Sequence, residues 1–240
     1  KLLMHAFKQV RPTTMLTVPM IIEKIYKNAV LPKINGNPIM AKMYKSAIGR
    51  KLINKIVGKT LREMFGGRMS TGFLGTPYIL HALSDNGRND VAYKLFFNEC
   101  NPSWLYSVNK GATTMWEHWN SIKDDGSFWS VSMNSFNHYA YGCVGDWMYG
   151  KICGIEIAEG GEGYSKLNIT PHPCERLGFS RCSIDTVRGR LESAWYYSGE
   201  SVKLDFLIPE GTEACITLPD GRRETVTGGS HCFTVAASDI

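Results

Sequence analysis

Gly160-Gly161-Glu162-Gly163 separates two parts of the chain whose apolar residues follow different periods. Before this stretch, apolar residues recur at intervals of three and four, which is typical of amphipathic helices. After it, apolar and polar residues alternate, which is typical of half-buried strands. The stretch therefore predicts a helical region followed by a β region.

The β region should contain seven short strands. Turn-forming residues separate three pairs of them, at residues 197–199, 209–211 and 219–221. Short alternating strands joined by such turns favour an antiparallel β-sandwich over residues 163–240. The expected strands are 166–170, 178–186, 189–197, 201–208, 213–218, 222–226 and 231–235.

The helical region begins with two paired helices. Pro77 opens the first and Asp85-Asn86-Gly87 ends it, because proline suits the first helical turn and glycine the residue after the last. Asn89 can cap a second helix that continues through Phe96.

The rest of the helical region is less regular. Residues 105–119 are rich in aromatic side chains and are expected to be irregular, and residues 121–130 are expected to form a polar loop. Residues 136–152 have an apolar face at helical spacing and predict a further helix, which Gly154 should stop.

Charge divides the chain at a different point. Residues 1–69 carry 14 basic and 2 acidic side chains, for a net charge of +12, whereas residues 70–240 carry 13 and 20, for a net charge of −7. The lysines of the basic part alternate with apolar helical positions, and no known nucleic-acid motif is present, so we expect no nucleic-acid partner. No run of eighteen apolar residues occurs, which predicts no membrane span.

The cysteines and the first residues give two further expectations. Seven scattered cysteines without a CxxC pair favour buried free thiols over a metal site or a disulfide framework. The chain starts at Lys1 without a methionine and enters patterned sequence at once, which suggests a fragment and leaves the localisation unknown.

Residues 1–69 have an α/β pattern of their own, with a short strand at residues 13–18 and basic amphipathic helices after it. Residues 10–19, 22–26 and 58–68 resemble the AMP-binding acyl-CoA synthetase family. The phosphate loop and the later aromatic motifs of that family are not in this sequence, and no catalytic residue is carried over. The resemblance changes at residues 69–70, which predicts a junction between two unrelated reading frames.

Three motifs after this junction occur in a fixed order. They are Thr71–Pro77, Gly111–Trp119 and Ser135–Gly142, which contain Thr-Gly-Phe-Leu-Gly-Thr-Pro, Trp-Glu-His-Trp and Asn-His-Tyr. Together they resemble the end of the (α/α)6 barrel of α-L-rhamnosidases, glycoside hydrolase family 78. The resemblance implies a helical piece of an (α/α)6 barrel over residues 70–162 and a C-terminal antiparallel β-sandwich over residues 163–240. With the α/β fragment that the pattern predicts over residues 1–69, the expected fold has three parts.

The candidate catalytic and sugar-binding side chains lie in the second and third motifs. A carboxylate between two tryptophans suits a sugar-cleaving site, because aromatic faces pack on a pyranose and a carboxylate can take a proton from water. An arbitrary sequence with this pattern would more often have two core tryptophans and a solvated glutamate. The resemblance implies that Glu117 is the general base of an inverting hydrolysis, that His138 binds the sugar, and that Trp116 is a wall of the sugar pocket.

The same resemblance implies that the general acid of the reaction is not in this sequence. In an inverting glycosidase a second carboxyl group serves as general acid, and in this family it lies on an earlier barrel segment. We therefore expect a rhamnosidase fragment that acts on rhamnose-containing glycosides in its parent form, needs no metal or cofactor, is inactive alone, and can self-associate through exposed barrel surface. An acyl-CoA synthetase fragment and a noncatalytic carbohydrate-binding module are the alternatives.

Overall fold

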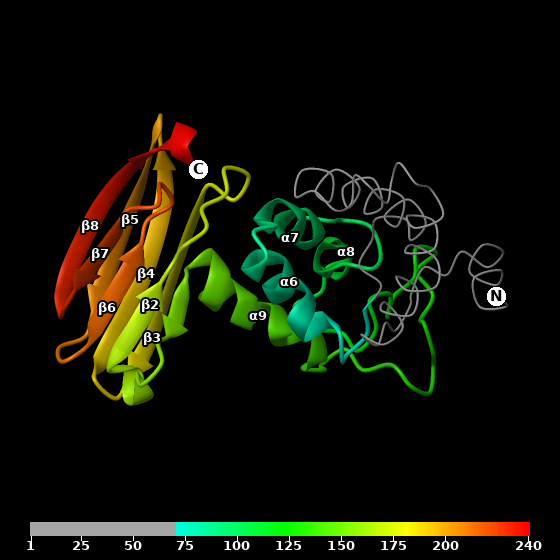
Figure 1. Ribbon diagram of the computed structural model, residues 1–240. Coiled ribbons are helices and arrows are strands. Elements are labelled where there is room, and N and C mark those ends of the chain that lie inside the picture. Colours follow the sequence, from blue (N-terminus) through cyan, green and yellow to red (C-terminus); the bar gives the residue numbers. More distant parts are fainter. Residues whose placement is uncertain (1–70) are drawn as a thin grey trace, which may run out of the picture. The chain divides into compact units, whose positions relative to one another are not determined.

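The computed structural model describes residues 71–240 (Figure 1), and the α/β elements and the junction expected near residue 69 lie outside them. The chain divides into two compact units. Among the described residues, the first unit contains residues 71–79 and 94–141, and the second contains residues 80–93 and 142–240. No helix of the described part is long and apolar enough to cross a membrane.

The two paired helices form where the sequence predicts them. Helix α6 spans Thr76–Asp85 and helix α7 spans Asn89–Phe96. Gly87, at a φ of +70°, ends the first helix, and the Arg88 amide reaches back to the Leu83 carbonyl at 2.8 Å. This is the hydrogen bond of a Schellman cap, which needs a residue with positive φ.

Two predictions for the part of the helical region after α7 are wrong in their bounds. Helix α8, Trp104–Asn109, covers the start of the stretch expected to be irregular, residues 105–119. The Ser103 hydroxyl caps this helix by accepting the Tyr106 amide at 3.1 Å. The helix expected over residues 136–152 begins only at residue 140, as a 3-10 turn (Ala140–Cys143) followed by α9 (Val144–Trp147) and a π-helical turn, η3 (Met148–Ile152).

A backbone hydrogen bond at His138 explains why this helix starts late. The His138 amide donates to the Met115 carbonyl at 2.8 Å, so this residue pairs with a distant segment and not with the preceding helical turn. Within the second unit, Trp147 is fully buried, its indole nitrogen donates to the Ser84 hydroxyl at 2.9 Å, and its ring lies edge-on to Tyr93. These contacts fix the helix after residue 140 against α6 and α7.

The β-sandwich is confirmed, with one more strand than expected. One sheet has the order β1-β2-β6-β7 and the other has the order β3-β4-β5-β8. The strands are β1 (Ile155–Ile157), β2 (Lys166–Ile169), β3 (Phe179–Thr186), β4 (Gly189–Ser198), β5 (Ser201–Ile208), β6 (Glu213–Thr217), β7 (Arg223–Val226) and β8 (Gly229–Ala236).

The sequence pattern missed two features of these sheets. Strand β1 is only three residues long, too short for alternation to be visible. Strands β2 and β6 pair in parallel, whereas every other strand pair of the sandwich is antiparallel. The pairing direction of strands distant in sequence is set by the packing of the sheets and cannot be read from alternation.

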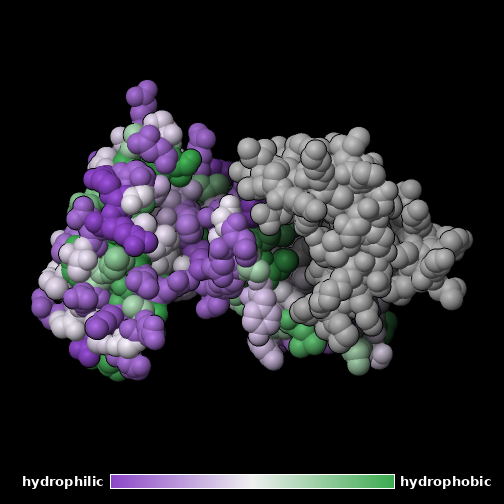
Figure 2. All heavy atoms as spheres, viewed as in Figure 1, coloured by the Kyte–Doolittle hydropathy of each residue, from purple (hydrophilic) through white to green (hydrophobic). Residues whose placement is uncertain are grey.

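The core of the sandwich consists of the alternate residues that point inward from both sheets. Leu167, Ile169, Ala214 and Ile216 of the first sheet are at most 1% exposed. The second sheet contributes Leu191, Trp195, Val202, Leu204, Phe206 and Ile208, none of which exceeds 2%. Hydrophilic side chains cover much of the exterior of the sandwich in the view of Figure 2.

The prediction of buried cysteines holds for only part of the set. All seven are free thiols in the structure; Cys153 and Cys182 are buried, while Cys100 and Cys232 are exposed. Cys232 lies on β8, whose even-numbered residues point away from the core. The expectation of burial is therefore wrong for the exposed pair.

Within the second unit, the backbone at Gly154 lies very close to the backbone that follows β2. A substitution at Gly154 tests this close approach. The φ of Gly154 is +79°, and a Cβ there would lie 2.2 Å from the Pro171 nitrogen, whereas Gly87 has a similar φ of +70° and open space around it. Gly87→Ala should cost about 1–2 kcal/mol from backbone strain alone. Gly154→Ala should cost at least about 3 kcal/mol, since backbone atoms must also move. Urea unfolding followed by tryptophan fluorescence measures both, and equal losses would contradict the close approach.

Candidate active site

The first motif, Thr71–Pro77, is a turn that leads into α6. The Thr71 and Thr76 hydroxyls lie 2.9 Å apart, and the Thr76 hydroxyl also donates to the Gly72 carbonyl at 2.9 Å. Both threonines are buried, and a side chain at Gly75 would crowd the Thr71 methyl group at 3.0 Å. These contacts hold the turn in its fold, and they fix the Thr71 carbonyl, which accepts a hydrogen bond from the Trp119 indole.

An aromatic cluster joins the three motifs. The Trp119 ring stacks on Tyr141 with centroids 3.7 Å apart, and its indole nitrogen donates to the Thr71 carbonyl at 3.2 Å. Trp104 lies edge-on to Trp119, and its own indole nitrogen donates to the Tyr141 carbonyl at 2.8 Å. Phe73 lies edge-on to Tyr141 and stacks on His138, with centroids 5.0 Å apart.

Backbone hydrogen bonds then align the second motif with the third. The Glu117 amide donates to the Ser135 carbonyl at 2.8 Å, and the His138 amide donates to the Met115 carbonyl at the same distance. The Thr114 hydroxyl donates to the Phe136 carbonyl. Residues 114–117 and 135–138 thus lie side by side although the bonded residues are eighteen or more positions apart in the chain.

The loop between these two segments is a small hairpin. Ile122 and Phe128 form a bridge, and Asp125 and Gly126 turn the chain, with the Asp125 carboxylate accepting the Ser127 amide at 2.9 Å. A hydrogen bond from the Ser127 hydroxyl, followed by the one from this amide, holds the pKa of Asp125 below its usual range. The polar loop expected at residues 121–130 is therefore ordered by its own turn chemistry.

Glu117 is half-buried between these segments, with 18% of its side chain exposed. Its Oε2 accepts the Ser135 backbone amide at 2.8 Å, which fixes the carboxylate in one orientation. Its Oε1 lies 4.0 Å from His118 Nε2, too far for a direct hydrogen bond. Among the described residues, Oε1 therefore has no hydrogen-bond donor and can accept a proton.

His118 is placed by stacking. Its ring lies against Trp129 with centroids 3.7 Å apart, and its Nε2 is buried with no hydrogen-bond partner among the described residues. Its backbone is fixed by the buried Ser121, whose hydroxyl donates to the His118 carbonyl at 3.1 Å. No sequence pattern marks His118 for a role, since its neighbourhood depends on Trp129, eleven positions further on.

His138 is half-buried, and one of its ring nitrogens is occupied. The Ala140 amide donates to Nδ1 at 3.2 Å, so the neutral ring carries its proton on Nε2. The ring is held between two aromatic neighbours, Phe73 and the largely exposed Tyr139. His138 therefore has one N–H available as a donor to a ligand.

Trp116 is less suited to the role predicted for it. Its side chain is 6% exposed and lies edge-on to Phe136, with centroids 5.4 Å apart. A buried indole offers little face for a sugar in this arrangement. Among the described residues, no group of three or more His, Cys, Asp and Glu side chains is arranged to hold a metal ion.

The structure thus brings Glu117 and His138 onto adjacent segments of one unit and buries Trp116 against Phe136. Sequence reasoning missed the Ser135 amide, which orients Glu117, because backbone groups have no sequence signature. It also missed Phe73, whose motif contacts the His138 ring.

Two family models match the chain. The model described as bacterial alpha-L-rhamnosidase 6 hairpin glycosidase domain matches residues 38–152, and that described as bacterial alpha-L-rhamnosidase C-terminal domain matches residues 154–233. The first match begins at residue 38 and overlaps the segment that resembles acyl-CoA synthetases. That second resemblance is not shown by the comparisons and stays a prediction.

Curated relatives agree with the family models. The alpha-L-rhamnosidase of Formosa agariphila is 41% identical over 166 residues, which cover 69% of this chain and 18% of that protein. An alpha-L-rhamnosidase of Streptomyces avermitilis is 44% identical over 171 residues, which cover 71% of this chain and 16% of that protein. The chain spans less than a fifth of the length of these two relatives.

Solved structures show the same similarity. The crystal structure of the Streptomyces avermitilis alpha-L-rhamnosidase complexed with L-rhamnose has a TM-score of 0.68 at 39% identity and covers 73% of this chain and 19% of that chain. Native alpha-L-rhamnosidase from Aspergillus terreus has a TM-score of 0.70 at 33% identity and covers 79% of this chain and 22% of that chain.

A six-hairpin glycosidase domain followed by a β-sandwich places the matched residues among the glycosidases. They belong to the bacterial α-L-rhamnosidase family, and they form the C-terminal part of such a protein.

The hydrogen bond from the Ser135 amide to Glu117 can be tested directly. Glu117→Ala should speed hydrogen exchange of the Ser135 amide by about tenfold or more, because a hydrogen bond to a charged acceptor is worth about 1.5–3 kcal/mol. Glu117→Gln keeps an acceptor oxygen in place and should retain most of the protection. Exchange measured by NMR that is equally fast in both variants would show that the carboxylate does not hold this amide.

Proposed function

We propose that the chain is the C-terminal part of an inverting α-L-rhamnosidase, which hydrolyses terminal α-L-rhamnosyl residues in its complete form. The observation that carries this proposal is the 41–44% identity to proteins named alpha-L-rhamnosidase over about 70% of the chain. The half-buried carboxylate of Glu117 lies within residues 38–152, which match the glycosidase domain of the family.

Glu117 supplies the base in this proposal. A general base must accept a proton from the attacking water, and the Oε1 of Glu117 is available while Oε2 is fixed by the Ser135 amide. The water oxygen bonds to the anomeric carbon as the bond to the leaving oxygen breaks, which inverts the configuration. One water proton goes to Glu117, and the leaving oxygen takes a proton from a separate general acid.

His138 and Trp116 complete the sugar-binding part of the proposal. The free N–H of His138 can donate to a sugar hydroxyl, and its stacking on Phe73 limits the ring to one orientation. Trp116 supports the segment that carries Glu117, and its burial favours this role over direct contact with sugar.

The general acid is expected in a barrel segment that this sequence does not contain. In inverting glycosidases the two carboxyl groups lie about 6.5–9.5 Å apart, and the chain corresponds to less than a fifth of its curated relatives. We therefore expect no useful hydrolysis of an aryl α-L-rhamnoside by the chain alone. Turnover that disappears in Glu117→Gln would contradict this expectation while supporting the role of Glu117.

A graft tests the proposed base in a complete enzyme. Residues 71–240 would replace the corresponding part of the Streptomyces avermitilis relative, and hydrolysis of an aryl α-L-rhamnoside would be measured. Glu117→Gln in the graft should lower kcat by about 10²- to 10⁴-fold, since this is the usual worth of a general base. Glu99→Gln, a change at an exposed carboxylate, is the matched control. NMR should show the inverted anomer as first product, and a retained anomer or equal kcat in both variants would refute the assignment.

Exposed apolar side chains of the first unit favour self-association. Leu74, Tyr78, Val131 and Met133 are between 64% and 95% exposed. Apolar groups in water promote association, so light scattering should find dimers or larger species. A stable monomer at high concentration would contradict this expectation.

Fewer observations support the two alternative functions. An acyl-CoA synthetase origin concerns only residues 1–69, and sequencing of the encoding DNA and transcript across codons 69 and 70 tests whether one reading frame continues through them. A purely noncatalytic carbohydrate-binding module is disfavoured by the match to a glycosidase domain over residues 38–152.

A further inference from the structure

We propose that the outer face of the sheet β3-β4-β5-β8 is a second saccharide-binding site, separate from the Glu117 site. Its residues are not among those the sequence analysis selected. The choice of a rhamnosyl sugar as ligand rests on the proposed function, whereas the site itself rests on the geometry of this sheet.

A hollow lies over the two central strands of the sheet. Ala194 on β4 is flanked by Arg181 on β3 and Asp205 on β5, its direct partners in the strand register. All three residues line a depression of about 630 Å³. Because alanine is much shorter than its neighbours, the depression opens at the middle of the sheet, and its size lies in the range of small-molecule sites.

Two aromatic side chains form one end of the hollow. Tyr196 on β4 and Phe179 on β3 are direct register partners, and they are 38% and 69% exposed. The Lys203 ammonium lies over the Tyr196 ring, 6.0 Å from its centroid, yet both aromatic side chains remain exposed to water. Such rings pack well on the apolar face of a pyranose, and L-rhamnose adds a methyl group to that face.

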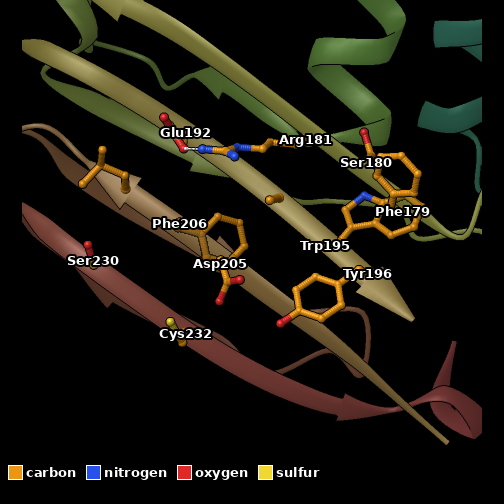
Figure 3. Close-up of a pocket in the computed structure, with 12 residues that line it drawn as sticks. Phe179, Ser180, Arg181, Glu192, Trp195, Tyr196, Asp205, Phe206, Ser230 and Cys232 are labelled. Atoms are coloured by element: carbon orange, nitrogen blue, oxygen red, sulfur yellow. Dashed lines mark hydrogen bonds and ion pairs between the residues drawn. The ribbon is translucent and has the colours of Figure 1, made fainter. Parts of the chain in front are cut away.

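Polar groups form the other side of the hollow. The Arg181 guanidinium donates to the Glu192 carboxylate at 2.7 Å (Figure 3). Arg190 also donates to Glu192. These two arginines, Arg190 foremost, hold the pKa of Glu192 below its usual range. Asp205 lies opposite Cys232 of β8, and its hydrogen bond raises the pKa of that thiol. Oriented carboxylates and a guanidinium are suitable partners for sugar hydroxyls.

The charge of the face favours a neutral ligand. The side chains that point outward from these strands include three cations and three anions, namely Arg181, Arg190, Lys203, Asp185, Glu192 and Asp205. They balance, so the face should not attract a polyanion such as a nucleic acid.

The position of the hollow also excludes an added peptide strand. Both β4 and β5 are paired on each side within the sheet. Their backbone groups are already bonded, so a peptide cannot extend the sheet at this place. A neutral ring compound that stacks on the exposed ring of Tyr196 or of Phe179 fits the remaining possibilities best.

The test uses the full chain and methyl α-L-rhamnoside. Saturation-transfer NMR measures binding, and alkylation of Cys232 by iodoacetamide, followed by peptide mass spectrometry, reports on the hollow itself. We expect the glycoside to bind and to slow alkylation of Cys232 but not of the exposed Cys100. Tyr196→Ala should weaken binding about tenfold, since one aromatic contact is worth roughly that factor. Thr234→Ala, an exposed change on the same sheet outside the hollow, is the matched control.

Variants of the first site keep the two proposals distinguishable. Slowed alkylation of Cys232 that persists in Glu117→Gln and His138→Ala, and is lost in Tyr196→Ala, would support the second site even if the graft described above shows no activity. Binding that depends on His138 and not on Tyr196, or no slowing of Cys232 alkylation at any glycoside concentration, would overturn it. Circular dichroism of each variant establishes that the fold is retained.

Discussion

The buried indole of Trp119 holds together the three segments that form the candidate active site. Its ring stacks on Tyr141 of the third motif, and its N–H bonds to the Thr71 carbonyl of the first motif. A single residue of the second motif thus touches both of the others. Since an indole offers a large apolar face and one polar atom, it can pack and bond in different directions at once.

The position of Glu117 follows from this arrangement. Once Trp119 and Tyr141 are stacked, the segments 114–117 and 135–138 run side by side, and the Ser135 amide reaches the Glu117 carboxylate. The carboxylate is then half-buried with one oxygen fixed and the other open. The carboxylate is thus oriented by the backbone without being cut off from solvent, as the proposed general base requires.

The sandwich shows how one sheet can serve two purposes. Alternate residues of β4 and β5 fill the core, and the intervening ones form the outer face with its hollow at Ala194. The inner face is constrained by packing, so its residues are uniformly apolar and buried. The outer face has no such constraint, and a balanced set of charges around two exposed aromatic rings therefore invites a functional explanation.

The sequence by itself determined the local elements and the family. Turn residues, capping positions and hydrophobic periods located α6, α7 and the seven longer strands, because these signals act over a few residues. The order of the three motifs also identified Glu117 and His138 as candidates. Tertiary structure alone decided the parallel pairing of β2 with β6, the late start of the helix at residue 140, the burial of Trp116 and the contact between the Ser135 amide and Glu117. These features depend on backbone groups and on contacts between residues far apart in the chain, which no local pattern of side chains encodes.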